Sequence, residues 1–511
     1  MNALGSLLNA RSIAVVGASD KPGSFGGQVV KNLVDFRYDG SVYPVHPRGG
    51  TLFGRACYRS LREIPQSPDC VALAVANHHL LGLLEEAADS NVRSAIVFGD
   101  PNVGTGRDRA LQDDIATLAR THAMAVCGPN AMGVYALHRR LVISGYPVRP
   151  TLSAGNVSLI THSGTVFDAM SQNNRDVTFN YVISCGNEAV LTAADYLHHV
   201  LDDPTTEVIA CYLETVRDPD NFVSALALAR ERRVPIVALK VGLSERGQSM
   251  TLAHTGALAG QADTYSALFA RYGVCQVHTL DEMMDTVELF SHGRAHMGRH
   301  LAVLMESGGE RSLVADLSDK LDLDFATLNE DTNTRLKSVL DEGVAPDNPL
   351  DAFGTGHDVV KVYRECLKVL DCDPDTGVLV LAVDLARDSY LSPAYVEAVL
   401  QAKPNLNHPL IAMVNLSAGA NQSLMSELRS NAIPVLMGTG SALKAISHWT
   451  RFGTGHHDPS SEISLPQRPE QSVRKALRRR LACAPAPLDE HESKRLLTSY
   501  GLTCSEEMIV E

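Results

Sequence analysis

The stretch SIAVVGAS, residues 12–19, is a short apolar run that breaks at a glycine. Gly23, Gly26 and Gly27 follow it, and the amphipathic run 29–36 comes next. The order of apolar strand, glycine-rich turn and helix is typical of a parallel α/β sheet, in which the turn brings its backbone close to a phosphate group. Because the glycine spacing departs from G-x-G-x-x-G, the stretch predicts nucleotide-type binding without specifying NAD.

The alternation of short apolar runs with helical patterns continues beyond this stretch in three rounds. Strands are expected at 41–45, 70–76, 94–98 and 123–127, then at 157–160, 178–184, 207–213 and 234–239, and finally from 301 and at 377–383, 409–415 and 433–437. Strands that alternate with helices form doubly wound parallel sheets. The sequence therefore predicts an α/β protein of several such units. A Pro- and Ser-rich linker with one short basic helix at 473–481 is expected after them.

The composition is that of an ordinary folded protein, with 511 residues of which 45% are hydrophobic and 20% charged. The formal net charge of -14 argues against a general nucleic-acid or anionic-membrane binder. The 10 cysteines include no C-x-x-C pair, so neither a zinc site nor a redox dithiol is expected. A start without signal-peptide features, and the lack of any apolar run of about 18 residues, predict a cytoplasmic protein without a membrane span.

Polar residues follow three of the strands expected in the second round. The segment 163–165 (Ser-Gly-Thr) follows the first, Glu214 follows the third, and His254 lies beyond the fourth at the head of a small-residue run, 253–260. Because the carboxyl ends of parallel strands share one edge, these residues are expected to line one crevice. There Glu214 would orient the imidazole of His254, and the Ser-Gly-Thr turn would offer backbone N–H groups to an anion. The pattern predicts a site built from a histidine and a bound phosphate.

With these residues in view, the chain resembles the NDP-forming acyl-CoA synthetases, a family that includes ADP-forming acetyl-CoA synthetase and, more distantly, succinyl-CoA synthetase. The motifs that carry the resemblance are VVGAS at 15–19, YPVHP at 43–47, GPN at 128–130 and AHTGALAG at 253–260. The implied domains are a Rossmann-like CoA-binding domain at 1–145, a flavodoxin-like domain with the phosphohistidine at 146–294, a second flavodoxin-like ligase-CoA domain at 295–453, a linker at 454–487 and the beginning of an ATP-grasp domain at 488–511.

The resemblance also implies a role for particular residues. His254 would carry a phosphoryl group and Glu214 would hydrogen-bond its imidazole. Two helix starts would face the phosphate, Ser163, Gly164 and Thr165 in one domain and Ser307, Gly308 and Gly309 in the next. The CoA-binding residues would be Gly17, Ala18, Ser19, Gly23, Gly26, Pro44, His46, Pro47, Gly128, Pro129 and Asn130. No metal ligand within this chain is implied.

The activity that the resemblance implies is an ADP-forming acid–CoA ligase. It would convert a carboxylic acid, ATP and CoA to acyl-CoA, ADP and phosphate through a phosphohistidine and an acyl phosphate, with an aryl or hydroxycinnamic acid such as ferulate as one candidate. ATP and Mg²⁺ would be held mainly by the remainder of the ATP-grasp domain, on a further segment or a partner subunit. A homo-oligomer is also expected, whereas a nucleic acid or a membrane is not an expected partner.

Other interpretations of the same residues stay open at this point. His254 is compatible with a structural role as a helix cap, and the opening glycine loop is compatible with an NAD-dependent oxidoreductase. The altered glycine spacing argues against NAD, as does the lack of an acidic ribose clamp at 44–47. A non-catalytic CoA-binding module is the remaining alternative. It predicts CoA binding without phosphorylation.

Overall fold

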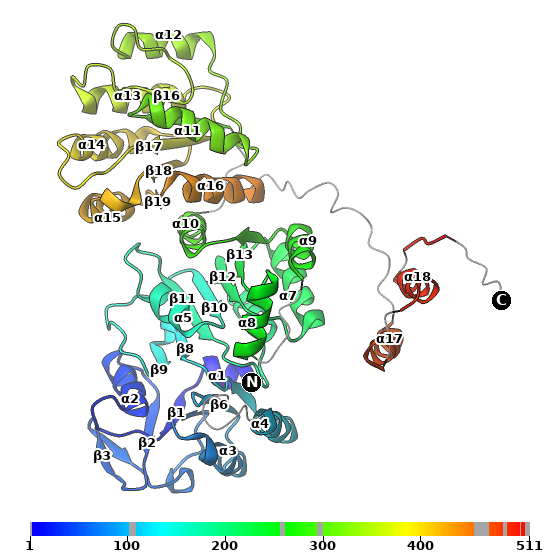
Figure 1. Cartoon of the computed structure of the whole chain (residues 1–511). Helices are drawn as coiled ribbons and strands as arrows, with labels where there is room; N and C mark the ends of the chain where they lie inside the picture. Colours follow the sequence, from blue (N-terminus) through cyan, green and yellow to red (C-terminus); the bar gives the residue numbers. More distant parts are fainter. Residues whose placement is uncertain are drawn as a thin grey trace. The chain divides into compact units, whose positions relative to one another are not determined.

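The computed structural model of the chain describes residues 3–101, 109–255, 261–293, 300–453, 470–483, 488–500 and 502–505, with the backbone alone at 3, 109, 252–255, 471, 482 and 483. Its first unit, residues 1–456, holds three large sheets and the two-stranded antiparallel sheet β3–β4 (Figure 1). The first sheet has the order β2-β1-β5-β6-β7, and all its pairings are parallel. The elements of this first domain, which includes the separate pair β3–β4, are α1 (Ala3–Leu8), β1 (Ser12–Val16), α2 (Phe25–Asp35), β2 (Ser41–Val45), β3 (Gly50–Leu52), β4 (Arg55–Cys57), β5 (Cys70–Leu73), α3 (Leu80–Asp89), β6 (Ser94–Val97), α4 (Arg109–Thr121) and β7 (Ala125–Cys127).

The second sheet has the order β14-β13-β12-β10-β11-β8-β9. Five of its strands are parallel, and the hairpin β8–β9 adds to β11 in the antiparallel sense. Its elements are β8 (Gly133–Ala136), β9 (Leu141–Ser144), β10 (Val157–Thr161), α5 (Gly164–Ser171), β11 (Phe179–Ser184), α6 (Ala193–Asp202), β12 (Val208–Leu213), α7 (Pro219–Arg232), β13 (Ile236–Lys240), α8 (Glu245–Thr255), α9 (Ala262–Tyr272), β14 (Cys275–Val277) and α10 (Leu280–Ser291).

The third sheet has the order β16-β15-β17-β18-β19 with parallel pairings throughout. Its elements are β15 (Leu301–Met305), α11 (Gly308–Asp319), α12 (Glu330–Val339), β16 (Leu350–Asp351), α13 (Val359–Asp371), β17 (Val378–Ala382), α14 (Ser392–Ala402), β18 (Leu410–Val414), α15 (Gln422–Ser430), β19 (Val435–Met437) and α16 (Thr439–Gly453). The parallel strands of all three sheets thus follow the flavodoxin-like order 2-1-3-4-5, which confirms the predicted α/β class.

The strand runs expected from the sequence correspond to strands of the structure, because buried parallel strands are nearly continuous apolar runs. All five residues of β10, for example, are buried. The sequence reasoning missed the hairpin β8–β9, which lies inside the range 1–145 but pairs with the second sheet. The change from the first sheet to the second therefore falls between β7 and β8, before residue 145. The hairpin's two strands are short, and no helical pattern separates them from the neighbouring strands. The alternation of strands with helices therefore did not predict the hairpin.

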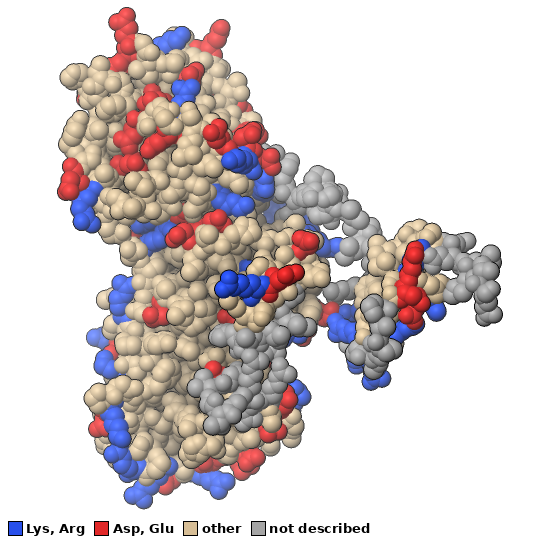
Figure 2. Space-filling model, viewed as in Figure 1, with Lys and Arg blue, Asp and Glu red and all other residues tan. Residues whose placement is uncertain are grey.

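The second unit, residues 457–511, contains the helices α17 (Gln471–Cys483) and α18 (Glu490–Ser499). The guanidinium of Arg480 on α17 pairs with the carboxylate of Glu492 on α18. Across the described residues, no helix combines the length and apolar composition that crossing a membrane requires. On the face drawn in Figure 2, basic and acidic side chains are interspersed rather than separated by sign.

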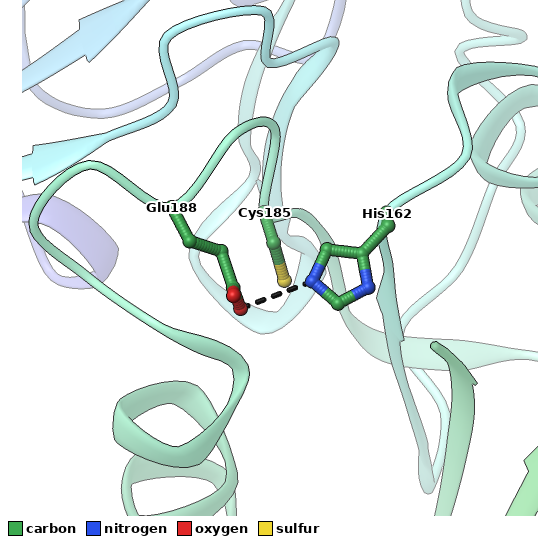
Figure 3. A group of neighbouring side chains, drawn as sticks. All are labelled: His162, Cys185 and Glu188. Atoms are coloured by element: carbon green, nitrogen blue, oxygen red, sulfur yellow. Dashed lines mark ion pairs between the residues drawn. The ribbon is translucent and has the colours of Figure 1, made fainter. Parts of the chain in front are cut away.

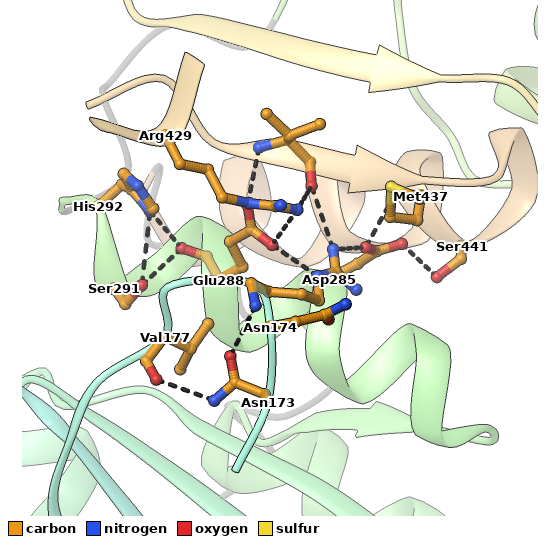
Figure 4. A network of polar contacts seen from close by, with 12 residues as sticks. Asn173, Asn174, Val177, Asp285, Glu288, Ser291, His292, Arg429, Met437 and Ser441 are labelled. Atoms are coloured by element: carbon orange, nitrogen blue, oxygen red, sulfur yellow. Dashed lines mark hydrogen bonds and ion pairs between the residues drawn. The ribbon is translucent and has the colours of Figure 1, made fainter. Parts of the chain in front are cut away.

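Helix α10 joins the second and third sheets, since it packs against β12 and β13 on one side and against β19 and α16 on the other (Figure 1). The carboxylate of Glu288 on α10 is fully buried and receives the guanidinium groups of Arg175 and Arg429, with Nε–Oε distances of 2.7 and 2.8 Å (Figure 4). Asp285, one turn earlier, also pairs with Arg175. Two carboxylates and two guanidinium groups balance in charge, and the network ties both domains to one helix.

Replacing Glu288 by glutamine should destabilise the first unit strongly, because two buried guanidinium groups would lose a shared counter-charge. The expected loss in the free energy of unfolding is about 3 to 5 kcal/mol, measured by urea denaturation. Arg62→Met is the matched control, since Arg62 and Asp89 form an ion pair in which both side chains are mostly exposed. That change should cost about 0 to 1 kcal/mol. Equal losses in the two variants would contradict a dominant role for the buried network.

Candidate functional site

The carboxyl ends of β10, β12 and β13 meet at one edge of the second sheet, because these strands are parallel neighbours. His162 follows β10, Glu214 follows β12, and Lys240 ends β13. The backbone N–H of Glu214 donates to Nδ1 of His162 at 3.1 Å, and Nζ of Lys240 donates to the carbonyl of Glu214 at 3.0 Å. Glu214 therefore lies at this edge, as predicted, and so does His162, the residue before Ser163.

His162 forms a buried pair with Glu188, which lies in the turn after β11. Nε2 of His162 lies 3.0 Å from Oε1 of Glu188, and the two side chains are 2% and 1% exposed (Figure 3). Oε1 also accepts the backbone N–H of Ala193 at the start of α6, and the guanidinium of Arg217 lies 3.9 Å from Oε2. A carboxylate that is buried away from water needs polar and positively charged neighbours of this kind.

Cys185 joins His162 and Glu188 in a group whose ligand-type atoms all lie within 4.8 Å of one another. A metal ion on Nε2 would need the lone pair of that nitrogen, which places the ring proton on Nδ1. Nδ1, however, accepts the N–H of Glu214, so the ring proton belongs on Nε2. Burial and the nearby Glu188 raise the pKa of Cys185 well above its usual value, which favours the thiol over a metal-binding thiolate. The geometry therefore fits a cluster of buried polar contacts rather than a metal centre.

Lys240 is a second buried charge at this edge, with 4% of its surface exposed. Its Nζ lies 4.7 Å from the centre of the Tyr265 ring. Burial lowers the pKa of Lys240 to about 8, and the carboxylate of Glu214 acts in the opposite direction. The lysine thus holds the end of β12 by hydrogen bonds and contributes positive charge next to the Glu214 carboxylate.

The predicted phosphoryl carrier, His254, lies outside the residues whose side chains are described, as does the run 256–260. Its backbone forms part of the last turn of α8, so a helix separates it from β13. The predicted contact between His254 and the Glu214 carboxylate remains an expectation. Glu214 itself is 8% exposed and lies at the edge where that contact is expected.

The first of the two predicted phosphate-facing segments, 163–165, begins a helix in the structure. Ser163 is the N-cap of α5, and its Oγ accepts the N–H of Val166 at 3.4 Å and lies 3.1 Å from Oγ1 of Thr165. Thr165 is exposed and Gly164 is partly exposed. Free backbone N–H groups in the first turn of a helix, together with two hydroxyl groups, can receive an anion.

The second predicted helix start differs in its surroundings. Ser307 is the N-cap of α11, so a helix does start here, and Gly308 and Gly309 in its first turn are exposed. Four carboxylates surround this turn, those of Glu306, Glu310, Asp351 and Asp384. Burial, followed by the charges of Asp384 and Asp351, raises the pKa of Glu306. A bare phosphate would be repelled here, in contrast to the turn at α5.

The glycine loop after β1 forms a cavity of about 360 Å³. Gly17 has φ +86°, and a Cβ on it would lie 2.2 Å from the carbonyl oxygen of Ala74, so only glycine fits. Ser24 caps α2 by accepting the N–H of Gly27. Residues from the loop, the start of α2 and two distant segments line the cavity, namely Ser19, Asp20, Lys21, Pro22, Gly23, Ser24, Gly27, Gln28, Lys31, Phe53, Gly145 and Pro147.

The other predicted CoA-binding residues do not line this cavity. Gly17, Ala18 and Gly26 form the backbone behind it, and the segment 44–47 lies at the end of the neighbouring strand β2. The turn 128–130 contacts the second domain instead. The backbone N–H of Asn187 donates to the carbonyl of Pro129 at 2.7 Å, and that of Ala189 donates to Gly128 at 3.1 Å.

Sequence reasoning did not assign a role to His162, Glu188 or Lys240. His162 directly precedes Ser163 and Gly164, which were interpreted as a phosphate-binding helix start. Glu188 directly follows the Gly186–Asn187 turn. A lysine at the end of the otherwise apolar run 236–240 was the clearest available signal, because a lysine is rarely buried without a partner.

Two protein families match the chain. The succinyl-CoA ligase like flavodoxin domain matches residues 154–290, and the CoA binding domain matches residues 11–136. The first match covers the sheet whose edge carries Glu214, and the second covers the sheet with the glycine loop. The structure and these matches define a CoA-binding α/β protein of the ligase type.

Three curated relatives resemble the chain over most of its length. It is 30% identical to the alpha subunit of acetate–CoA ligase [ADP-forming] II of Pyrococcus furiosus, over 83% of this chain and 93% of the relative. It is 29% identical to trans-feruloyl-CoA synthase of an unknown prokaryotic organism, over 86% of this chain and 64% of the relative. It is 28% identical to acetate–CoA ligase [ADP-forming] of Methanocaldococcus jannaschii, over 96% of this chain and 70% of the relative.

The chain therefore belongs to the family of NDP-forming acyl-CoA synthetases, the ADP-forming acid–CoA ligases, as its motifs predicted. It spans less than two thirds of the feruloyl-CoA synthase. Its fold is similar to that of the dinucleotide forming acetyl-coenzyme A synthetase 1 of Ca. Korarchaeum cryptofilum, solved with phosphate and ADP. That likeness has a TM-score of 0.78 at 24% identity and covers 89% of this chain and 98% of the other.

Lys240→Met tests the buried lysine through the pH dependence of stability. The pKa of Lys240 is about 8 in the folded chain, against 10.5 for an unperturbed lysine. Between these values the unfolded chain binds more protons, so the wild type should gain stability relative to Lys240→Met as the pH rises. The gain should be at most about 1.4 kcal/mol per pH unit, measured by urea unfolding on both sides of pH 8. Lys361→Met, at an exposed lysine, should show no such trend.

Proposed function

We propose that the chain is the CoA-binding and phosphoryl-carrying part of an ADP-forming acid–CoA ligase. The observation that carries the proposal is the similarity to the alpha subunit of an ADP-forming acetate–CoA ligase over nearly that subunit's whole length. The buried polar edge of the second sheet, with an exposed helix start beside it, suits a reaction that moves a phosphoryl group.

The proposed reaction has three steps that balance. Nε2 or Nδ1 of His254 attacks the γ-phosphorus of ATP, and ADP leaves. A carboxylate oxygen of the substrate then attacks that phosphorus, which frees the imidazole and gives an acyl phosphate. The thiolate of CoA attacks the acyl carbon, and phosphate leaves as the thioester forms. A carboxylate beside the imidazole, the role proposed for Glu214, stabilises the positive charge that forms on the ring.

The start of α5 is the proposed receptor for the phosphoryl group of phosphohistidine. Its N-cap serine, partly exposed glycine and free N–H groups offer donors at the positive end of the helix dipole. The start of α11 carries four nearby carboxylates, so we propose that it faces phosphate only when a cation or a proton offsets their charge. The α5 turn is therefore the stronger of the two proposed phosphate sites.

The cavity of the glycine loop is the proposed site of the CoA pyrophosphate. The exposed residues Lys21 and Lys31 line it, together with the glycine loop and the start of α2, whose first-turn N–H groups suit a phosphate. We propose that the segments 44–47 and 128–130, which lie outside the cavity, contact other parts of the coenzyme or connect the domains.

The proposed substrate is a carboxylic acid, and we propose the aryl or hydroxycinnamic class, such as ferulate, as the first to be tested. Its support is the 29% identity to a feruloyl-CoA synthase. Acetate and 4-hydroxybutyrate ligases are similar at 28% and 25% identity, so they supply the competing acids of an assay panel.

We propose that an ATP-grasp domain or subunit supplies the nucleotide site and binds ATP with Mg²⁺. Two relatives are named as alpha subunits, which supports a partner polypeptide. We also propose that this chain, together with its ATP-grasp domain or subunit, forms a homo-oligomer. The complete enzyme in the following experiment is this chain together with that domain or subunit.

Radiolabelled γ-phosphate of ATP should appear on the complete enzyme as an acid-labile, base-stable label. His254→Ala should abolish the label because no other imidazole is proposed to accept the phosphoryl group. His278→Ala, at an exposed histidine, is the control and should keep the label. Label that persists on the His254→Ala protein would defeat the proposed carrier, and a wild type that binds CoA without any label would favour the non-catalytic module.

Lys21→Met should weaken CoA binding by about 10-fold, since one charge-assisted contact to a phosphate oxygen is lost. Calorimetric titration of the chain with CoA measures this change, with Lys361→Met as the control that should bind as the wild type does. NADH should not bind at comparable concentration. Tight NADH binding with no CoA binding would support the oxidoreductase alternative instead.

A further inference from the structure

A series of contacts leads from the first domain to the end of β12. Its first links are the backbone hydrogen bonds of Asn187 to Pro129 and of Ala189 to Gly128, at 2.7 and 3.1 Å. Glu188 lies between these two residues and has φ +53°. The backbone N–H groups of both neighbours donate to the turn after β7, and these two hydrogen bonds fix the direction of the Glu188 side chain.

The next links are side-chain contacts buried inside the second domain. Glu188 contacts Nε2 of His162 at 3.0 Å (Figure 3). Nδ1 of His162 accepts the backbone N–H of Glu214 at 3.1 Å. A ring that accepts on Nδ1 carries its proton on Nε2, the nitrogen that lies 3.0 Å from the Glu188 carboxylate. The two contacts therefore select one neutral tautomer.

Glu214 is held at both of its peptide groups. His162 accepts its N–H, and Lys240 donates to its carbonyl at 3.0 Å. Fixing both neighbouring peptide planes fixes the direction of the Cα–Cβ bond, and with it the region that the carboxylate can reach. A carboxylate that must meet an imidazole within hydrogen-bond distance depends on such a support.

We propose that the Glu188–His162 pair is a positioning device for Glu214, in which a neutral His162 bridges the two glutamates through its 3.0 Å contact with Glu188 and its hydrogen bond from the Glu214 N–H, and does not act as an acid, a base or a metal ligand. The inference rests on the proposed function, because Glu214 is the carboxylate assigned to the phosphohistidine. It assigns a role to two residues that touch neither ATP nor CoA in the proposed reaction.

The test compares His162→Gln with His162→Leu in the complete enzyme. A carboxamide keeps one acceptor for the Glu214 N–H and one donor for Glu188, whereas leucine keeps neither. His162→Gln should form phosphohistidine within about 3-fold of the wild-type rate, and His162→Leu should be slower by about 10- to 100-fold. The readout is the single-turnover rate of label transfer at saturating ATP.

The matched control is His300→Leu, which breaks the half-exposed pair between Nδ1 of His300 and Asp375 in the third domain. It should leave the rate unchanged. His162→Gln as slow as His162→Leu would overturn the proposal, because the ring itself would then be needed. His162→Leu as fast as the wild type would overturn it as well.

A second measurement stays decisive if His162→Leu does not fold. Nitrogen NMR of the histidine-labelled wild-type chain should show one imidazole held as the neutral Nε2–H tautomer, and His162→Gln should remove that signal. A cation or an Nδ1–H tautomer at His162 would overturn the bridge. This measurement does not require catalysis. A wild-type enzyme that is not labelled by ATP would contradict the proposed function, whereas the tautomer of His162 would still test the proposed role of the Glu188–His162 pair.

Discussion

The parallel pairing of β10 with β12, and of β12 with β13, sets the distances on which the candidate site depends. In this register Thr161 lies beside Tyr212 and Leu213 beside Lys240, so the residues that follow each strand emerge at one edge. The apolar faces of these strands are buried, which leaves the strand ends as the places where polar side chains can gather. Charge at that edge is costly unless it is paired or hydrogen-bonded, and the Lys240 ammonium meets that requirement by donating to the backbone carbonyls of Glu214 and Val241.

The three sheets share a strand order, yet their helix starts differ in electrostatics. At α5 the first turn presents the hydroxyl groups of Ser163 and Thr165, whereas at α11 it lies among four carboxylates. The helix dipole is similar in both cases, so the side chains decide which turn attracts an anion. This asymmetry is consistent with different roles for the two domains in a phosphoryl relay.

Helix α10 stabilises the arrangement of the second and third domains. It closes the second sheet and forms part of the core beneath the third, and its two buried carboxylates receive arginines from segments on either side. A network of this kind favours one arrangement of the two domains, since any other would leave charges buried without partners. The sheet edge that carries Glu214 is thus built into a firmly joined part of the first unit.

The sequence by itself was sufficient for the α/β class, the three rounds of strands and the edge that carries Glu214, because buried parallel strands are contiguous apolar runs and their carboxyl ends converge. It was also sufficient for the family, through short motifs such as the one around His254. Only the tertiary structure revealed the Glu188–His162 pair and the pairing of β8–β9 with the second sheet. Those contacts join residues far apart in the chain, and no local period or spacing specifies which buried polar groups will face each other.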